Sequence, residues 1–306
     1  MKSAILHTFG GPDVVTIGEA TTRVAQMNEV AVRVEAAAVN PLDLKIIAGY
    51  MQQVFPIELP YIPGTDFSGV IESVGAQVTH LKPGDRVIGR MQPAVGGAFA
   101  NQVVIEAASV VVMPEGMSFE QGAALPTVFG TASQALFDIG ALQRGETVLI
   151  HAGAGGVGSM AVQLAREAGA RVIATASARN HEMVRSLGAD EVIDYRTQDI
   201  SRLRDVDLVI DTIGADSLEK SWGVLRAGGR IATTVEFSIA ARDGHAGMFV
   251  FFADAARFMP QAMRLFEQGR LQIITDTIFK LEDVRFALER QAAGHACGKL
   301  IVRVGK

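Results

Sequence analysis

The segment TVLIHAGAGGVGSMAVQLAREAGARVIATASAR, residues 147–179, decides the fold of this chain. It opens with an apolar, β-branched run over 147–150 that is typical of a buried strand. A complete G-x-G-x-x-G motif follows over 153–158, and apolar residues then recur at helical spacing over 157–168. A second apolar strand is predicted over 171–175. The segment therefore predicts a strand, a glycine turn, a helix and a second strand.

The three glycines of the motif each have a physical task. The first permits a tight turn, the second lets the backbone approach a pyrophosphate, and the third lets the helix pack closely on the strand. Free N–H groups at the helix N-terminus favour an anion there. In this context the motif predicts a dinucleotide site. The residues expected to form it are Gly153, Ala154, Gly155, Gly156, Val157 and Gly158. The alternative is a plain glycine turn in an α/β domain.

The acidic residue that would bind an NAD ribose is missing. It is expected about twenty residues after the glycines, at the end of the second strand. That place holds Thr175-Ala176-Ser177-Ala178-Arg179, and the first acid is Glu182. A carboxylate would repel a 2′-phosphate, whereas Ser177 and Arg179 would bind and neutralise it. We therefore expect NADPH. The alternative is that Arg179 is a solvated charge and that both cofactors are used.

Composition excludes several classes of protein. The chain has 306 residues, enough for two domains, and its 49% apolar and 20% charged residues are typical of a soluble globular protein. The net charge of −5 without a basic block argues against nucleic acid and membrane partners. The single cysteine, Cys297, excludes an internal disulfide framework. The N-terminal segment is too short and polar for a signal peptide, so we expect a cytoplasmic enzyme.

The pattern of strands and helices predicts two domains. Residues 1–120 contain short strands typical of a partly open barrel. Residues 121–265 alternate strands and helices, which indicates a doubly wound parallel sheet. Residues 266–306 are too few for a domain and are expected to fold back on the first. The fold class is thus α/β, with an active site expected in the cleft between the domains.

The expected elements outside the glycine segment follow from apolar runs between turn residues. The run 249–251 shows neither helical nor strand context. Strands are predicted over 30–34, 67–74, 86–89, within 98–112, and over 191–194, 207–211, 230–235, 271–276 and 299–304, and helices near 181–187 and 281–293.

Short motifs run through the whole chain in a specific order. They are Ala38-Val39-Asn40-Pro41-Leu42-Asp43, Pro63-Gly64-Thr65-Asp66-Phe67-Ser68-Gly69-Val70, Gly84-Asp85-Arg86-Val87, Gly96-Gly97-Ala98-Phe99-Ala100, Leu125-Pro126-Thr127, the glycine segment, Leu187-Gly188-Ala189-Asp190-Glu191-Val192-Ile193-Asp194-Tyr195, and Gly298-Lys299. In this order the chain resembles the zinc-independent, zeta-crystallin-like quinone oxidoreductases of the medium-chain dehydrogenase/reductase superfamily. The resemblance implies a GroES-like catalytic domain, a Rossmann domain, NADPH as hydride donor and a homodimer.

The residue types argue against a zinc site. Zinc-dependent relatives place a cysteine after the first conserved strand and His-Glu after the Pro-Gly segment. Here those regions hold Asn40 and Asp43, and Thr65-Asp66. The six histidines show no i, i+3 or i, i+4 pairing, so a thiol-and-imidazole site cannot be assembled. We expect no metal, with an Asp/His site as the alternative.

Two residues are predicted to act on the acceptor. Without a Lewis acid, the expected reaction is hydride transfer from the nicotinamide to an electron-poor quinone or α,β-unsaturated carbonyl. The resemblance places Asn40 beside nicotinamide or substrate, where its amide would donate to a carbonyl oxygen. Tyr50 would donate a hydrogen bond or stack on a quinone ring. The alternatives are an Asn-Pro turn and a half-buried aromatic residue.

Five further residues are predicted to bind the cofactor. Thr127 offers a hydroxyl group. Gly214 and Val235 are predicted to end sheet strands, so they offer backbone groups near the nicotinamide. The resemblance places Tyr195 near the 2′-phosphate. Relatives often carry an arginine where Cys297 stands. If that arginine holds a cofactor phosphate, Lys299 is expected to take over the contact, and the alternative is that the contact is absent.

The sequence thus predicts an NADPH-dependent, zinc-independent quinone or enone oxidoreductase. Two alternatives stay open. One is an enoyl-thioester reductase, which shares this scaffold. The other is an NADPH-binding sensor or RNA-binding structural protein, although the acidic net charge argues against RNA. No Tyr-x-x-x-Lys or G-x-S-x-G motif is present, which argues against a short-chain dehydrogenase and a hydrolase.

Overall fold

The computed structural model describes residues 1–305 and divides into two compact units. The terminal unit comprises Met1–Thr127 and the residues from Ala253 onward, and the inserted unit comprises Val128–Phe252. The chain therefore crosses between units at 127/128 and at 252/253. The helix α7, Met259–Glu267, belongs to the terminal unit, although the sequence analysis assigned most of it to the sheet domain.

The inserted unit is built on a six-stranded parallel sheet in the order β10-β9-β8-β11-β12-β13. Renumbered along the chain this is 3-2-1-4-5-6, the Rossmann order. The predicted α/β fold class is confirmed. The strands are β8 Thr147–Ile150, β9 Arg171–Ala176, β10 Glu191–Asp194, β11 Val206–Asp211, β12 Leu225–Thr233 and β13 Ala246–Phe249.

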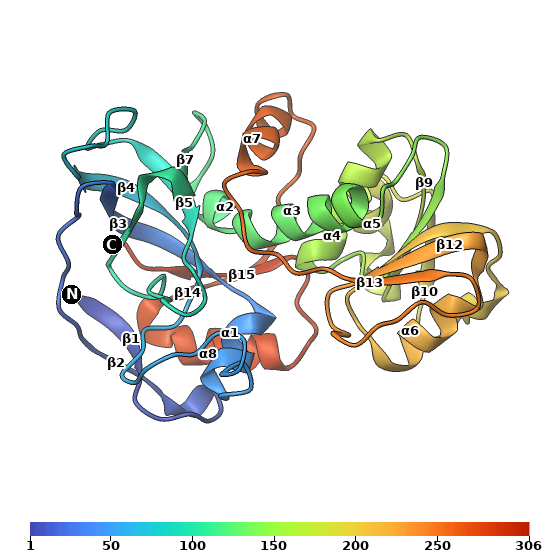
Figure 1. Cartoon of the computed structure of the whole chain (residues 1–306), viewed down its shortest axis with the longest axis horizontal. Helices are drawn as coiled ribbons and strands as arrows, with labels where there is room; N and C mark the ends of the chain where they lie inside the picture. The colour runs from blue at the N-terminus through green and yellow to red at the C-terminus, as the bar shows by residue number, and fades with distance from the viewer. Residues whose placement is uncertain (306) are drawn as a thin grey trace. The chain divides into compact units, whose positions relative to one another are not determined.

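Helices connect these strands, and their apolar faces pack on the sheet. In α4, Met160, Ala161, Leu164 and Ala165 are buried, as the helical spacing predicts. Figure 1 shows the strands of this unit with α4, α5 and α6 around them. Helix α3, Pro126–Ser133, begins in the terminal unit and continues into the inserted one. The other helical elements are the π-helix Gln134–Ile139, α4 Gly156–Glu167, α5 His181–Ser186, α6 Ala215–Trp222, and the 3-10 turns Ala178–Asn180 and Ile200–Arg202.

Three strand predictions need correction. The run 249–251 was given no strand context, yet Phe249 ends β13, which pairs in parallel with β12. The strand β12 ends at Thr233, so Val235 lies two residues beyond it. The strand predicted over 271–276 forms later in the chain, as β14 Thr275–Lys280.

The terminal unit contains one seven-stranded sheet and one antiparallel pair. Strand β15 pairs with β3, so the end of the chain folds back on its beginning as expected. The order of the large sheet is β14-β15-β3-β4-β5-β7, with β6 also paired to β3. The strands are β1 Lys2–Leu6, β2 Val15–Glu19, β3 Glu29–Val39, β4 Asp66–Val74, β5 Arg86–Arg90, β6 Gln102–Glu106, β7 Val110–Val112, β14 Thr275–Lys280 and β15 Lys299–Arg303.

The core of the terminal unit follows the alternation in β3. Val30, Val32 and Val34 are fully buried and Arg33 is exposed, but Ala31, on the same face as Arg33, is also buried. Helix α8 packs beside α1, and Figure 1 shows the two together although they come from opposite ends of the chain. None of the helices in the described part of the chain has the length and apolar character that a membrane crossing requires. The remaining elements are α1 Pro41–Ile47, α2 Phe119–Ala123, α7 Met259–Glu267, α8 Val284–Ala292, and the 3-10 turns Pro12–Val14, Ala107–Ser109 and Leu281–Asp283.

Candidate active site

The glycine turn connects the end of β8 to the start of α4. Gly155 is the N-cap of α4, with extended backbone angles and no side chain to cap the helix. The first amides of a helix have no partner within it. The Gly155 N–H donates to the Ala152 carbonyl oxygen at 2.8 Å, which closes the turn, whereas Gly156 and Val157 begin the helix and are half-buried. The turn therefore presents an anion-binding end of a helix.

The three motif glycines differ in what an added side chain would meet. A Cβ on Gly158 would lie 2.1 Å from the carbonyl oxygen of Ala152, and one on Gly153 would lie 2.8 Å from the Cβ of Ala174. On Gly155 the nearest atom would be the Ala152 oxygen, at 3.3 Å. The fold itself thus demands the first and third glycines. At the second glycine the contact is milder, and the lack of a side chain there would let a pyrophosphate approach the backbone.

The residues predicted to recognise the 2′-phosphate follow neighbouring strands. Ser177 comes directly after β9, is buried, and accepts a hydrogen bond of 3.3 Å from Asn180 Nδ2. Arg179 lies exposed in the following 3-10 turn. Tyr195 follows β10 and is 52% exposed, with the Arg196 guanidinium 5.6 Å from its ring centre. Because β9 and β10 are adjacent and parallel, all three residues follow the same edge of the sheet.

Asp211 organises the loops that contain Gly214 and Val235. Its buried carboxylate ends β11 and accepts hydrogen bonds from the backbone N–H of Gly214, at 2.9 Å, and from Thr233 Oγ1, at 2.7 Å. Thr233 Oγ1 in turn accepts from the Val235 N–H at 3.2 Å. The sequence analysis missed Asp211. The signal that could have identified it is an acid that directly follows the apolar run Leu208-Val209-Ile210 at the end of the strand.

In the terminal unit, Asn40 lies at the centre of a buried polar cluster. It is 2% exposed and forms the N-terminal capping box of α1 with Asp43. Its Nδ2 donates to Asp66 Oδ2 at 3.0 Å and to Thr65 Oγ1 at 3.4 Å. Its Oδ1 accepts from Lys299 Nζ at 2.6 Å. The Asn40 amide therefore already has protein partners for each of its polar atoms.

The burial of Lys299 corrects its predicted phosphate contact. Its Nζ donates to the Val39 carbonyl oxygen and to Asn40 Oδ1, both at 2.6 Å, and the residue is 5% exposed. Burial lowers the pKa of Lys299, while the charges of Asp66 and Asp43 raise it. The ammonium group is thus committed to the interior of the terminal unit.

Asp43, a second acid of the cluster, has a raised pKa because it is buried. Burial raises the pKa of Asp43 to about 7, against the opposing effect of the hydrogen bond from the Asn40 N–H. Among the described residues, Asp43 Oδ1 has no hydrogen-bond partner. The cluster therefore contains a carboxyl group that changes protonation near neutral pH.

Thr127 joins the cluster rather than standing apart from it. Its hydroxyl donates to Asp66 Oδ1 at 2.7 Å and accepts from Arg90 Nε at 3.0 Å. The cofactor contact expected of this hydroxyl stays a prediction. Tyr50, also predicted to act on the acceptor, lies in the turn after α1 and is 82% exposed.

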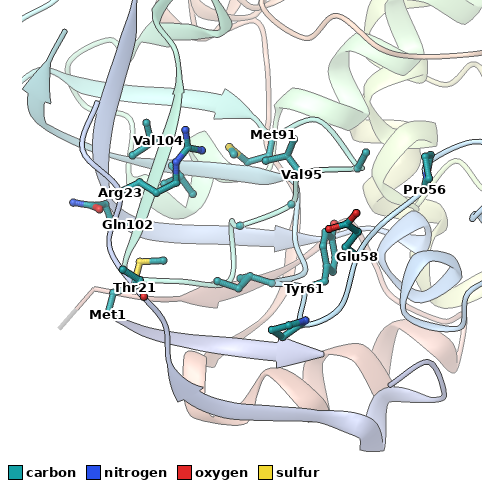
Figure 2. Close-up of a pocket in the computed structure, with 16 residues that line it drawn as sticks. Met1, Thr21, Arg23, Pro56, Glu58, Tyr61, Met91, Val95, Gln102 and Val104 are labelled. Atoms are coloured by element: carbon teal, nitrogen blue, oxygen red, sulfur yellow. The ribbon is translucent and has the colours of Figure 1, made fainter. Parts of the chain in front are cut away.

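The terminal unit also contains a cavity of about 530 Å³. Figure 2 shows Tyr61 and Glu58 toward one end of it and Arg23 and Gln102 toward the other. Tyr61 is buried and its hydroxyl donates to the Pro93 carbonyl oxygen at 2.7 Å. The described residues that line this cavity include neither Asn40 nor Tyr50, the two residues predicted to act on the acceptor. Within residues 1–305, no group of three His, Cys, Asp or Glu side chains is placed to hold a metal ion.

Comparisons with known proteins agree with this architecture. Two family models match the chain, the alcohol dehydrogenase GroES-like domain over residues 26–115 and the zinc-binding dehydrogenase domain over residues 187–302. Human quinone oxidoreductase is 30% identical over 99% of this chain and 97% of its own length.

Solved structures give the same result. A quinone oxidoreductase from Coxiella burnetii superposes with a TM-score of 0.91, at 32% identity over 99% of both chains. The Escherichia coli quinone oxidoreductase complexed with NADPH superposes with a TM-score of 0.89, at 25% identity over 99% of this chain and 100% of its own.

The fold and the glycine turn define an oxidoreductase that uses a nicotinamide cofactor. The chain belongs to the quinone oxidoreductases of the medium-chain dehydrogenase/reductase superfamily. The resemblance identified from the sequence motifs is thereby confirmed.

Proposed function

We propose that this protein is an NADPH-dependent oxidoreductase that transfers hydride to a quinone or an α,β-unsaturated carbonyl compound without zinc. The observation that carries the choice of cofactor is the edge of the sheet after β9. Ser177 and the exposed Arg179 lie there, and no acid occupies the expected ribose-binding place. A guanidinium and a hydroxyl group suit a phosphate, which a carboxylate would repel.

The inserted unit is proposed to hold the cofactor by its backbone. The half-buried amides of Gly156 and Val157, at the start of α4, would bind the pyrophosphate. Asp211 fixes the loops after β11 and β12, so the backbone groups of Gly214 and Val235 would be held in place beside the nicotinamide. When bound, the reduced nicotinamide supplies the hydride.

The acceptor needs polarisation rather than a strong acid, because a quinone or an enone is already electron-poor. We propose Asn40 and Tyr50 for this task. The hydrogen bond from Asn40 Nδ2 to Thr65 Oγ1 is long, at 3.4 Å, so this hydrogen is the one for which a carbonyl oxygen would compete. The exposed Tyr50 ring would stack on the acceptor. The homodimer and the cytoplasmic location expected from the sequence stay predictions.

The test is a comparison of NADPH and NADH oxidation with a simple quinone and a simple enone, after chelator treatment. NADPH-linked turnover that survives the chelator supports the proposal. Absence of turnover with every acceptor, despite tight NADPH binding, supports the sensor instead.

Arg179→Glu then isolates the 2′-phosphate contact. We expect kcat/KM for NADPH to fall about 10- to 100-fold, the value of one charge-assisted hydrogen bond, with little change for NADH. The matched control is Arg185→Glu, at another exposed arginine further along the chain in α5. An equal loss with both cofactors would remove the 2′-phosphate argument.

A further inference from the structure

Both chain crossings between the units meet one side chain. Thr127 is the last residue of the terminal unit before the first crossing, and Ala253 is its first residue after the second. Arg90 Nε donates to Thr127 Oγ1 at 3.0 Å, and Arg90 Nη1 donates to the Ala253 carbonyl oxygen at 3.3 Å. One guanidinium group therefore joins two points that are 126 residues apart in the sequence.

Asp66 completes this arrangement on the opposite strand. Asp66 and Arg90 are direct partners in the antiparallel pairing of β4 with β5, and their charged groups lie 3.9 Å apart. Asp66 Oδ1 accepts from the Thr127 hydroxyl at 2.7 Å, and Asp66 Oδ2 accepts from the Thr127 N–H at 3.3 Å. The two side chains are 0% and 5% exposed, so the charge pair itself is buried, while the bonds to Thr127 are partly buried.

The same two segments are also packed together within the inserted unit. A Cβ on Gly130, three residues after the first crossing, would lie 2.2 Å from the ring of Phe252, the last residue before the second. Only glycine allows this approach. The buried pair of Asp66 and Arg90 therefore holds the two crossing segments in the terminal unit, and the contact of the Phe252 ring with Gly130 holds them in the inserted unit.

We propose that Asp66 and Arg90 form a clamp that fixes both chain crossings to the edge of the β4–β5 pair. Arginine suits this role because its planar fork can reach two acceptors at once, whereas a lysine offers a single ammonium group. Movement of either crossing then requires that Arg90 give up a partly buried hydrogen bond. Asp66 also accepts from Asn40 Nδ2, so the clamp is continuous with the polar cluster around Asn40.

The test is hydrogen–deuterium exchange of the backbone amides near Thr127 and near Ala253 in the full chain. Arg90→Lys keeps the charge that faces Asp66 but cannot hold both acceptors. We expect amide exchange in both segments to rise about fivefold, the factor expected for one lost hydrogen bond. Arg86→Lys is the matched control on the same strand, since Arg86 bonds instead to the Met117 carbonyl, and it should change neither segment.

A second pair of variants keeps the proposal testable if Arg90→Lys folds poorly. Thr127→Val removes the hydroxyl that accepts from Arg90, and Thr127→Ser retains it. The clamp predicts faster exchange near the distant Ala253 in Thr127→Val and near-normal exchange there in Thr127→Ser. Unchanged exchange near Ala253 in both Arg90→Lys and Thr127→Val would overturn the proposal, whatever the enzymatic activity of the variants.

Discussion

Lys299 donates a hydrogen bond of 2.6 Å to Asn40 Oδ1, which joins the last strand of the chain to the residue that caps helix α1. A bond from a charged donor is roughly twice as strong as one between neutral groups. It also decides which way the Asn40 amide faces, because its oxygen must meet the ammonium and its nitrogen must meet Asp66. The cluster thereby sets the orientation of a residue proposed to contact the acceptor.

Lys299→Met should destabilise the protein. The variant leaves Asn40 Oδ1 and the Val39 carbonyl oxygen without their buried donor, and we expect the free energy of unfolding to fall by about 2–4 kcal/mol. Arg303→Met is the control on the same strand, because the pair of Arg303 with Glu120 is partly exposed and should contribute no more than about 1 kcal/mol. Urea unfolding measures both, and similar losses in the two variants would contradict the buried role of Lys299.

Asp43 should make stability depend on pH. Its pKa is about 7 in the folded chain against an ordinary value of 3.8, so the folded state holds a proton that the unfolded state releases. The resulting stabilisation is complete below pH 3.8 and is lost as the pH rises toward about 7. At 1.36 kcal/mol per pKa unit the loss amounts to about 4 kcal/mol.

Asp43→Asn should remove this loss. The variant also loses some stability at every pH, because one polar atom of the new amide is buried where Asp43 Oδ1 has no hydrogen-bond partner among the described residues. Free energies of unfolding measured from about pH 4 to about pH 8 should therefore show a smaller decline in Asp43→Asn than in the wild type. Parallel curves for the two proteins would show that Asp43 ionises normally.

The glycine turn should separate folding from cofactor binding. Gly155→Ala meets the Ala152 carbonyl oxygen at 3.3 Å, a tight contact that should lower the thermal midpoint much less than Gly158→Ala does, while the added methyl group lies in the turn proposed to hold the pyrophosphate. We expect NADPH affinity to fall about tenfold or more in a fluorescence titration. Gly158→Ala, by contrast, meets the Ala152 oxygen at 2.1 Å and should lower the thermal midpoint as well. Normal NADPH binding by Gly155→Ala would place the pyrophosphate elsewhere.

The contact between Gly130 and Phe252 should behave as a coupled pair. Gly130→Ala forces a methyl group into the Phe252 ring and should cost about 1–3 kcal/mol of stability. Phe252→Leu vacates that space, so the double variant should recover part of the loss. A double-mutant cycle by chemical denaturation measures the coupling, and strictly additive effects would mean that the two residues do not meet.

Much of the inserted unit could be predicted because its signals are local. The glycine motif and the strands at 147–150 and 191–194 are continuous stretches, and the structure places both strands at the predicted bounds. β13 was missed because its sequence, AGMF, contains no β-branched residue and none of its four residues is buried. Pairing with β12, rather than local preference, makes it a strand.

The polar cluster could be predicted only in part, because its members lie far apart in the sequence. Asn40 was identified from its place before Pro41, but Lys299 lies 259 residues later. At the start of the apolar run 299–304 a lysine is normally a solvated flank, so its burial had no sequence signal. Arg90, at the end of β5, likewise has no sequence signal for its burial. Only tertiary pairing brings these charges next to Asp66.

The shared contacts of Arg90 also bear on how such a chain can be recombined. The inserted unit is one continuous segment, and the residues that flank its two ends, Thr127 and Ala253, bond to the same guanidinium group. Entry and exit thus lie close together, which is the geometry that tolerates domain insertion. A chimera that exchanges residues 128–252 for the corresponding segment of a relative has two junctions, and Arg90 contacts the residue that flanks each of them, so we expect such an exchange to fold when this arginine is kept.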